Sequence, residues 1–328
     1  MGKHLWISDN DVIKWDHDGI RYCLHIQYDE AGFNPRKDMD NICEMACWHR
    51  GYSLGDDVQE SQPETYWCRL LRDNVPMDEI NRALMSGKIN WIRVQPNVED
   101  PGLFDVYETS MIQTVVDDSD PKEYLAYSGV RGGALFDCVE DDLNVADCQK
   151  LLEPYAEWMP LWLYDHSGLS ISCGRRTGQY ADRWDSGCVG WIVALKSKVM
   201  EETVEIVRGE DGEPIMEEHK HEGRTSTFTY KTRPLTEDTW RERAIEIMES
   251  ETDLYDEYLR DDLYCYTLYN WGDGDWVEED SCGGFIGGDL MENGIADEVG
   301  CGLKECLESE KYTMGEATIR HIVRYEFG

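Results

Sequence analysis

The sequence predicts an α+β fold: a mixed, mainly antiparallel sheet with packed helices and an inserted polar hairpin. Two observations predict it. Segments that alternate with a period of two are interspersed with amphipathic segments of helical period, and the two kinds do not alternate strictly. The chain has 328 residues, 41% of them hydrophobic, with 12 Trp and 18 Tyr, so it can bury a large core. We expect one domain over residues 1–328.

The first half of the chain predicts strands and short helices. Residues 20–29 alternate as a strand, which places four residues on one side: Tyr22, Leu24, Ile26 and Tyr28. Residues 41–52 predict a short helix that ends near Gly51. The other predicted segments are a helix at 78–86, strands at 92–98 and 103–118, and an amphipathic helix at 143–158.

The second half contains the clearest helix. Apolar runs predict core strands at 160–172 and 188–196, and 200–234 predicts a polar hairpin with an exposed tip at 209–214. Thr236 begins a helix that extends to Arg260, with a buried stripe. The stripe consists of Trp240, Ala244, Ile247, Met248, Tyr255 and Tyr258. Strands are expected at 261–270 and 317–327. We interpret the His219, Lys220, His221 and Arg224 cluster as a solvated loop.

The chain carries a large excess of negative charge. There are 68 Asp and Glu against 31 Lys and Arg, a formal charge of −37. The acids are uneven: residues 99–120 hold seven and residues 261–302 hold eleven, and neither segment contains Lys or Arg. This excess argues against direct binding of nucleic acid or an anionic membrane and favours basic partners or cations. Adaptation to salt is the alternative, and it predicts evenly spread acids.

Within the acidic C-terminal half (236–302), carboxylates recur on one face of the predicted helix. They are Glu242, Glu246, Glu249, Asp253 and Asp256. Successive members lie roughly 5 Å apart along the helix axis, which is of the order of the ~3.4 Å charge spacing along a nucleic-acid strand. The acids that extend this strip are Asp273, Asp275, Glu278, Glu279 and Asp280. A tight acidic hairpin turn is the other interpretation of that last segment, which lacks the EF-hand order.

A catalytic centre is the alternative at 160–191. Asp165, His166 and Asp185 could act as metal ligands or bases, and the neighbouring nucleophile candidates are Ser167, Ser186 and Cys188. No G-x-S-x-G elbow is present, and adjacent strand residues point to opposite faces. We therefore expect the Asp and Ser side chains to hold turns and His166 to satisfy buried polar groups.

We expect no cofactor and no metal. Cys43, Cys47 and His49 lie close in sequence, but a zinc site needs more ligands, so we interpret the cysteines as buried thiols. No segment approaches the length of a membrane span, and the first residues lack the apolar core of a signal peptide. The expected location is a cytoplasm with reduced thiols.

The segments PLWLYDHSG (160–168) and RWDSGCVGW (183–191) carry a resemblance. Together with the order of the other segments, they resemble a family of uncharacterised acidic proteins carried by bacteriophages and conjugative elements. The resemblance spans most of the chain, with the hairpin at about 200–234 as an addition. It implies a mobile element inside a bacterial cell and supplies no catalytic residues.

The charge and this context lead to one main hypothesis and two alternatives. The main hypothesis is a non-enzymatic DNA mimic that blocks a restriction or CRISPR nuclease of the bacterial host. The first alternative is a metal-dependent hydrolase or nucleic-acid-modifying enzyme with its site at the 160–191 strand ends. The second is an interaction protein for a basic replication or conjugation partner.

Overall fold

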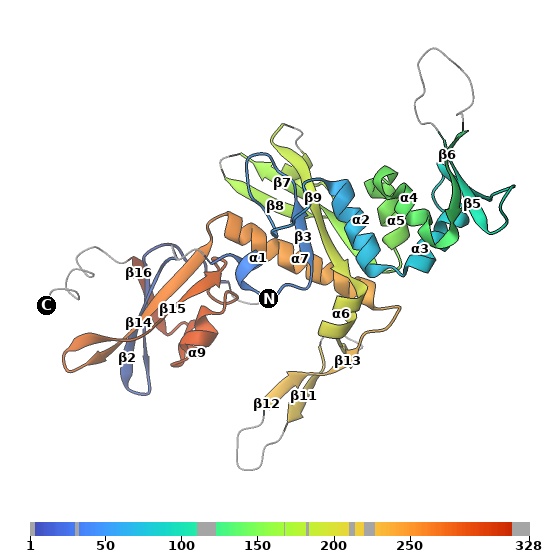
Figure 1. Ribbon diagram of the computed structural model, residues 1–328. Helices are drawn as coiled ribbons and strands as arrows, with labels where there is room; N and C mark the ends of the chain where they lie inside the picture. The colour runs from blue at the N-terminus through green and yellow to red at the C-terminus, as the bar shows by residue number, and fades with distance from the viewer. Residues whose placement is uncertain are drawn as a thin grey trace. The chain divides into compact units, whose positions relative to one another are not determined.

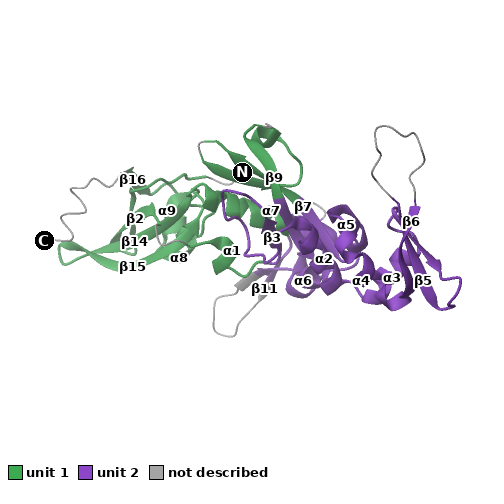
Figure 2. Cartoon of the chain, turned by 45° about the horizontal axis from the view of Figure 1, so that its top comes forward, with its two compact units in different colours: residues 1–41, 160–189, 247–328 green, residues 42–159, 190–246 purple. Residues whose placement is uncertain are grey.

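The computed structural model describes residues 4–29, 33–109, 123–166, 168–181, 184–209, 214–219 and 227–316. Helices and antiparallel sheets mix without strict alternation, which confirms the α+β class (Figure 1). The chain forms two compact units (Figure 2). Unit 1 comprises Met1–Asn41, Pro160–Val189 and Ile247–Gly328, and unit 2 comprises Ile42–Met159 and Gly190–Glu246. A single folding domain stays a prediction.

Unit 1 contains a five-stranded antiparallel sheet in the order β15-β14-β2-β1-β16. Its strands are β1 (Asp11–His17), β2 (Ile20–Tyr28), β14 (Leu263–Gly272), β15 (Asp275–Ile286) and β16 (Tyr312–Glu316). Alternate side chains such as Ile13, Leu24 and Tyr266 are buried. They pack in one apolar cluster with residues of α8 (Ile295–Val299) and α9 (Leu303–Glu308). The sheet therefore has one packed face and two edge strands, β15 and β16.

The predicted alternation in β2 is confirmed with one exception. Tyr22, Leu24 and Ile26 are buried, whereas Tyr28, at the end of the strand, is 48% exposed. The predicted strand at 261–270 corresponds to β14. The predicted strand at 317–327 lies outside the described residues.

Unit 2 has a core of helices packed against one another. The helices are α2 (Pro63–Asn74), α3 (Met77–Met85), α4 (Leu135–Val139), α5 (Val145–Leu152) and α6 (Lys196–Glu202), with 3-10 turns at Gly132–Ala134 and Glu140–Asp142. Trp67 and Leu71 are fully buried in this core. A three-stranded sheet of β4 (Ile92–Pro96), β5 (Leu103–Thr109) and β6 (Glu123–Arg131) belongs to the same unit.

Two helix predictions in unit 2 are confirmed with changed bounds. The helix predicted at 78–86 is α3, and the one predicted at 143–158 ends at Leu152 as α5. Asn144 caps α5, since its side chain accepts from the Asp147 N–H (3.0 Å) in a reciprocal capping box. The chain re-enters a strand at Ala156, so the predicted helix was too long.

The predicted helix at 41–52 is wrong. Glu44–Cys47 forms β3, which pairs antiparallel with β9 (Ser186–Leu195). Met45 and Ala46 are buried, and a Cβ on Gly190 would come within 1.9 Å of the Ala46 carbonyl oxygen. The two backbones approach so closely that strand pairing overrides the local helical pattern.

Strands β3, β9, β7 and β8 form a four-stranded sheet in that order. Strands β7 (Ala156–Asp165) and β8 (Leu169–Cys173) form an antiparallel hairpin, and a 3-10 turn follows at Gly178–Ala181. Both predicted core segments, 160–172 and 188–196, therefore lie in this sheet. Leu161, Ile171 and Ile192 are among its buried apolar residues.

Helix α7 extends over Trp240–Leu259. Five of the six predicted stripe residues are buried, and Tyr258 is half-buried. Before the helix, the Thr236 N–H donates to Thr239 Oγ1 (3.0 Å) and the Trp240 N–H donates to the Thr236 carbonyl (3.1 Å). A short helix, α1 (Pro35–Asp38), contributes Arg36, which is buried and pairs with Glu251 of α7 at 2.7 Å.

The inserted hairpin at about 200–234 is confirmed in the described residues. Strand β10 (Val204–Ile206) pairs with β13 (Thr232–Pro234), and β11 (Met216–His219) pairs with β12 (Thr227–Tyr230). Paired strands therefore lie on both sides of the tip predicted at 209–214: β10 precedes it in the chain, and β11 follows it and pairs with β12. Residues 210–213 and the predicted His219–Arg224 side-chain cluster lie outside the described part. No helix in that part is long and apolar enough to cross a membrane.

Candidate functional site

The predicted acidic face of α7 is incomplete, because Asp256 does not belong to it. Glu242, Glu246, Glu249 and Asp253 are exposed, whereas Asp256 is 6% exposed. Its Oδ1 accepts from Ser170 Oγ and from the Ile171 N–H, both at 2.7 Å, and Arg260 forms an ion pair with its other oxygen. Asp256 therefore joins α7 to β8 and cannot meet a partner. Its inclusion in the array was wrong.

The first two acids of α7 line a cavity that also contains arginines. Glu242 and Glu246 line this cavity of about 320 Å³ together with Arg233 and Arg243. The Arg243 guanidinium pairs with Glu246 at 3.0 Å, whereas Arg233 pairs with Glu205. A basic partner would have to displace Arg243 to reach Glu246, so this end of α7 presents less uncompensated charge than the sequence predicted.

The C-terminal part of α7 crowds carboxylates. Partial desolvation of its carboxylate first, and then the charge of Asp256, raises the pKa of Asp253, although its side chain remains exposed. Burial and Asp262 likewise raise the pKa of Glu257, and burial raises the pKa of Asp262. Helix C-termini already disfavour negative charge, because the last carbonyls point outwards there. These acids therefore carry an electrostatic cost in the folded chain.

The β14–β15 hairpin presents the second predicted set of acids without burying any of them. Five carboxylates are exposed, those of Asp273, Asp275, Glu278, Glu279 and Asp280. Gly272 pairs with Asp275 across a two-residue turn, in which Asp273 (φ 51°) and Gly274 (φ 89°) are both left-handed. An Asp-Gly pair suits this turn, and its twist matches the strands. The tight acidic hairpin turn is confirmed as the geometry of this segment.

In the described part of the chain, two of the hairpin acids have polar partners and none has a cationic one. Tyr266 Oη donates to Asp280 Oδ2 and Asn270 Nδ2 donates to Glu279 Oε2, each at 3.0 Å. Among the described residues, no Lys or Arg forms an ion pair with any of the five acids. The Lys14 ammonium lies over the Trp276 ring, 5.8 Å from its centre. This surface therefore keeps its negative charge.

The residues of the catalytic alternative meet through their backbones. The Asp165 N–H donates to the Asp185 carbonyl at 2.9 Å, which joins the end of β7 to the start of β9. Asp165 and His166 are exposed, and the His166 ring stacks beside Tyr164 with centres 6.2 Å apart. The expectation that His166 satisfies buried polar groups is therefore wrong. The two aspartates are thus neighbours, as that alternative requires.

One of the nucleophile candidates, Ser186, has a structural role in this region. Ser186 Oγ donates to the Tyr180 carbonyl (2.8 Å) and accepts from the Arg176 guanidinium (3.0 Å). Cys188 is exposed, and Ser167 lies outside the described residues. Ser186 therefore fixes a turn, in line with the structural interpretation of this motif.

The sequence cluster of Cys43, Cys47 and His49 has a different arrangement. Cys43 is buried and Cys47 is half-buried on β3. His49 Nδ1 accepts from the N–H groups of Gly51 and Tyr52, both at 3.2 Å, so that nitrogen closes a loop. In the described residues these three side chains do not form a converging group of metal-ligand type.

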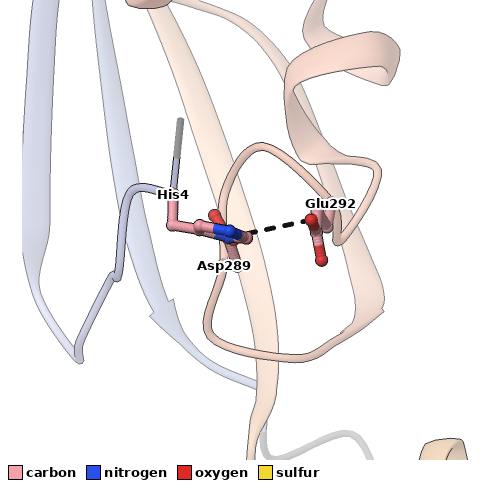
Figure 3. A group of neighbouring side chains, drawn as sticks. All are labelled: His4, Asp289 and Glu292. Atoms are coloured by element: carbon pink, nitrogen blue, oxygen red, sulfur yellow. Dashed lines mark hydrogen bonds and ion pairs between the residues drawn. The ribbon is translucent and has the colours of Figure 1, made fainter. Parts of the chain in front are cut away.

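A converging group is present in unit 1 instead, and sequence reasoning missed it (Figure 3). His4 Nδ1 lies 2.6 Å from Asp289 Oδ2 and 3.7 Å from Glu292 Oε1. Asp289 is buried, and its Oδ1 accepts from the N–H groups of Leu5 (2.9 Å) and Met291 (3.1 Å). The hydrogen bond to Asp289 raises the pKa of His4. The two halves are 285 residues apart in sequence, so no local motif signals them.

Comparison of the chain with models of known protein families, with curated proteins and with solved structures gives no match.

Proposed function

We propose that this chain is a non-enzymatic, acidic binding protein of a bacteriophage or mobile element. It acts as a DNA mimic in the bacterial cytoplasm and blocks a nucleic-acid-binding host effector, a restriction or CRISPR nuclease. One observation carries the proposal: five exposed carboxylates cluster on the β14–β15 hairpin, and no ion pair among the described residues neutralises them.

The hairpin combines charge with apolar anchors. Trp271 and Val277 are about half exposed beside the acids, and Trp271 meets Trp276 edge to face, 5.2 Å between ring centres. Tryptophan is enriched at the centres of protein interfaces, and surrounding charges speed encounter with an oppositely charged partner. This composition supports a protein partner with a basic groove.

The carboxylates of this surface replace phosphates at the partner. Same-face residues on a strand lie about 7 Å apart, so the hairpin is less densely charged than duplex DNA, which carries one charge per ~1.7 Å of axis. Glu249 and Asp253 on α7 are the exposed helix acids that no neighbouring arginine of the cavity compensates. We expect inhibition to weaken steeply between about 50 and 200 mM salt.

A competing role for the same acids is protection of a sheet edge. Strand β15 is an edge strand, and charges on edges discourage pairing with other chains. The two roles differ in what is lost when the charges are removed: the first predicts loss of inhibition in a monomeric protein, the second predicts aggregation.

The test uses isosteric neutralisation of the whole set. The five substitutions are Asp273→Asn, Asp275→Asn, Glu278→Gln, Glu279→Gln and Asp280→Asn. The measurement is displacement of a fluorescent duplex from a restriction nuclease and from a CRISPR nuclease. We expect the wild type to displace the duplex and the variant to lose at least tenfold in potency while it remains monomeric.

A matched control variant makes the same change in charge at a different place on the chain. Its five substitutions lie on exposed acids of unit 2: Glu64→Gln, Glu99→Gln, Asp100→Asn, Asp137→Asn and Asp141→Asn. Equal loss of potency in both variants would reduce the effect to net charge alone. No displacement by the wild type would remove the nuclease proposal, and capture of a basic replication protein would favour the second alternative.

The hydrolase alternative rests on the contact between Asp165 and Asp185. It has less support because Ser186 is used in a turn and the Asp165–Asp185 contact is between backbone atoms. A metal-dependent nuclease assay with His166→Ala and Asp185→Asn tests it, and activity lost in both variants would favour this alternative.

A further inference from the structure

We propose that His4, Asp289 and Glu292 form a binding site for a divalent transition-metal ion, which fastens the N-terminal segment to the loop after β15. A ligand atom from each residue lies within 4.8 Å of the others. An imidazole nitrogen with two carboxylates is a donor set that suits Zn²⁺, Co²⁺ or Mn²⁺. The inference is independent of the hairpin surface.

The spacing of the donor atoms suits an ion. Bonds of ~2.0–2.1 Å in a tetrahedral site place neighbouring ligand atoms about 3.4 Å apart. The His4 nitrogen lies 2.6 Å from the Asp289 oxygen and 3.7 Å from the Glu292 oxygen, values on either side of that distance. Small side-chain rotations of His4 and Glu292 therefore bring all three to an ion.

The backbone preorganises two of the three ligands. The Ile7 N–H donates to the Gly288 carbonyl (2.8 Å) and the Leu290 N–H donates to the Leu5 carbonyl (2.9 Å). Asp289 is additionally fixed by the two N–H groups that its Oδ1 accepts, which leaves Oδ2 directed at His4. Such outer contacts orient a ligating carboxylate and strengthen metal binding.

The exposure of two ligands and the composition of the segment that supplies the carboxylates favour a bound cation. The side chains of His4 and Glu292 are 53% and 70% exposed, so water can complete the coordination. The segment 261–302, which supplies both carboxylates, contains no Lys or Arg. The strong negative charge of the chain also raises the local concentration of cations.

A simple ion pair between His4 and Asp289 is the competing explanation, and Glu292 separates the two. The ion pair needs no Glu292, whereas the metal site does. Glu292→Gln keeps the shape of an exposed side chain and removes its charge and one acceptor oxygen, so we expect the fold to be retained.

The experiment titrates the untagged full chain, first stripped with a chelator, with Co²⁺ and follows visible absorption. We expect one saturable equivalent with the spectrum of nitrogen and oxygen ligands and without thiolate charge-transfer bands. Glu292→Gln and His4→Ala should each weaken binding at least tenfold. His17→Ala, at a half-buried histidine outside the group, should leave binding unchanged.

Three results would overturn the site. They are a wild type without a saturable equivalent, a thiolate spectrum, and unchanged affinity in Glu292→Gln. Zn²⁺ competition for the bound Co²⁺ supplies a second readout, and circular dichroism of each variant verifies that the fold is intact.

Discussion

The β14–β15 hairpin and helix α7 each carry five predicted acidic residues, yet they present them differently. On the hairpin all five are exposed and none has a cationic partner in the described chain. On α7 the last acid is buried in a hydrogen-bonded ion pair, and the first two share a cavity with arginines. Acidity in a sequence therefore identifies an interaction surface only where the fold neither buries nor neutralises it.

The largest effect on stability is expected from the buried member of the helix set. Asp256→Ala removes the acceptor of the Ser170 and Ile171 donors and leaves Arg260 unpaired. Buried donors left unsatisfied cost about 1–3 kcal/mol each, and we expect a loss of about 3 kcal/mol in unfolding free energy. Denaturant unfolding measures it. The matched change Asp253→Ala should cost below about 0.5 kcal/mol; equal losses would contradict the structural role of Asp256.

The stability of the hairpin should depend on its turn rather than on its acids. Gly274 has φ 89°, and a side chain there costs about 1–2 kcal/mol. We expect Gly274→Ala to lower the unfolding free energy by that amount. It should also weaken displacement of the duplex from the nuclease, because the carboxylates lose their register. Gly187→Ala is the control, since a Cβ there meets no atom within 4 Å and its φ is not left-handed. A turn variant of wild-type stability would refute the two-residue turn.

The pH dependence at the end of α7 should be small and of a defined sign. Burial raises the pKa of Glu257, so the folded chain holds this proton to higher pH than the unfolded chain. Stability from this group is greatest at low pH and falls as pH rises through the raised pKa. Glu257→Gln should therefore stabilise the protein at pH 7 by about 0.5 kcal/mol, a gain that vanishes below about pH 4. Unfolding curves at pH 7 and below about pH 4 test this prediction. A Glu257→Gln variant that is less stable than the wild type at pH 7 would contradict it.

The smallest change is expected from a helix acid that lines the cavity. Glu242→Gln alters an exposed residue beside Arg243 in the cavity. Stability should change by less than about 0.5 kcal/mol and duplex displacement by less than twofold. If this single change weakened displacement as much as the hairpin set does, α7 rather than the hairpin would be the interaction surface.

Much of the fold could be predicted from local pattern. The alternation in β2, the apolar stripe of α7 and the Asp-Gly turn between β14 and β15 each encode their element through side-chain period or turn chemistry. The conformation of the segment 41–52 could not be predicted, because it depends on Gly190, nearly 150 positions away. Gly190 has no side chain, and this allows β3 to pair closely with β9. Helical spacing of Met45 and Ala46 alone carries no information about that neighbour.

The candidate site divides in the same way. Exposure of the hairpin acids follows from their position around a turn, which sequence can locate. Burial of Asp256 requires knowledge that β8 packs there, and the His4 group requires two segments at opposite ends of the chain. Residues whose roles depend on distant partners remain outside the reach of local patterns.

Because unit 1 is built from three separate segments of the chain, its neighbouring strands are synthesised at different times. Strand β2 is complete by Tyr28, but its neighbour β14 begins only at Leu263. At ~5–20 residues per second, a ribosome takes roughly 10 to 50 seconds to supply that neighbour. During this interval the early β1–β2 ribbon has an open flank, whereas every segment of unit 2 has been translated by Glu246. We expect unit 2 to fold first on the nascent chain, with chaperones shielding the waiting ribbon.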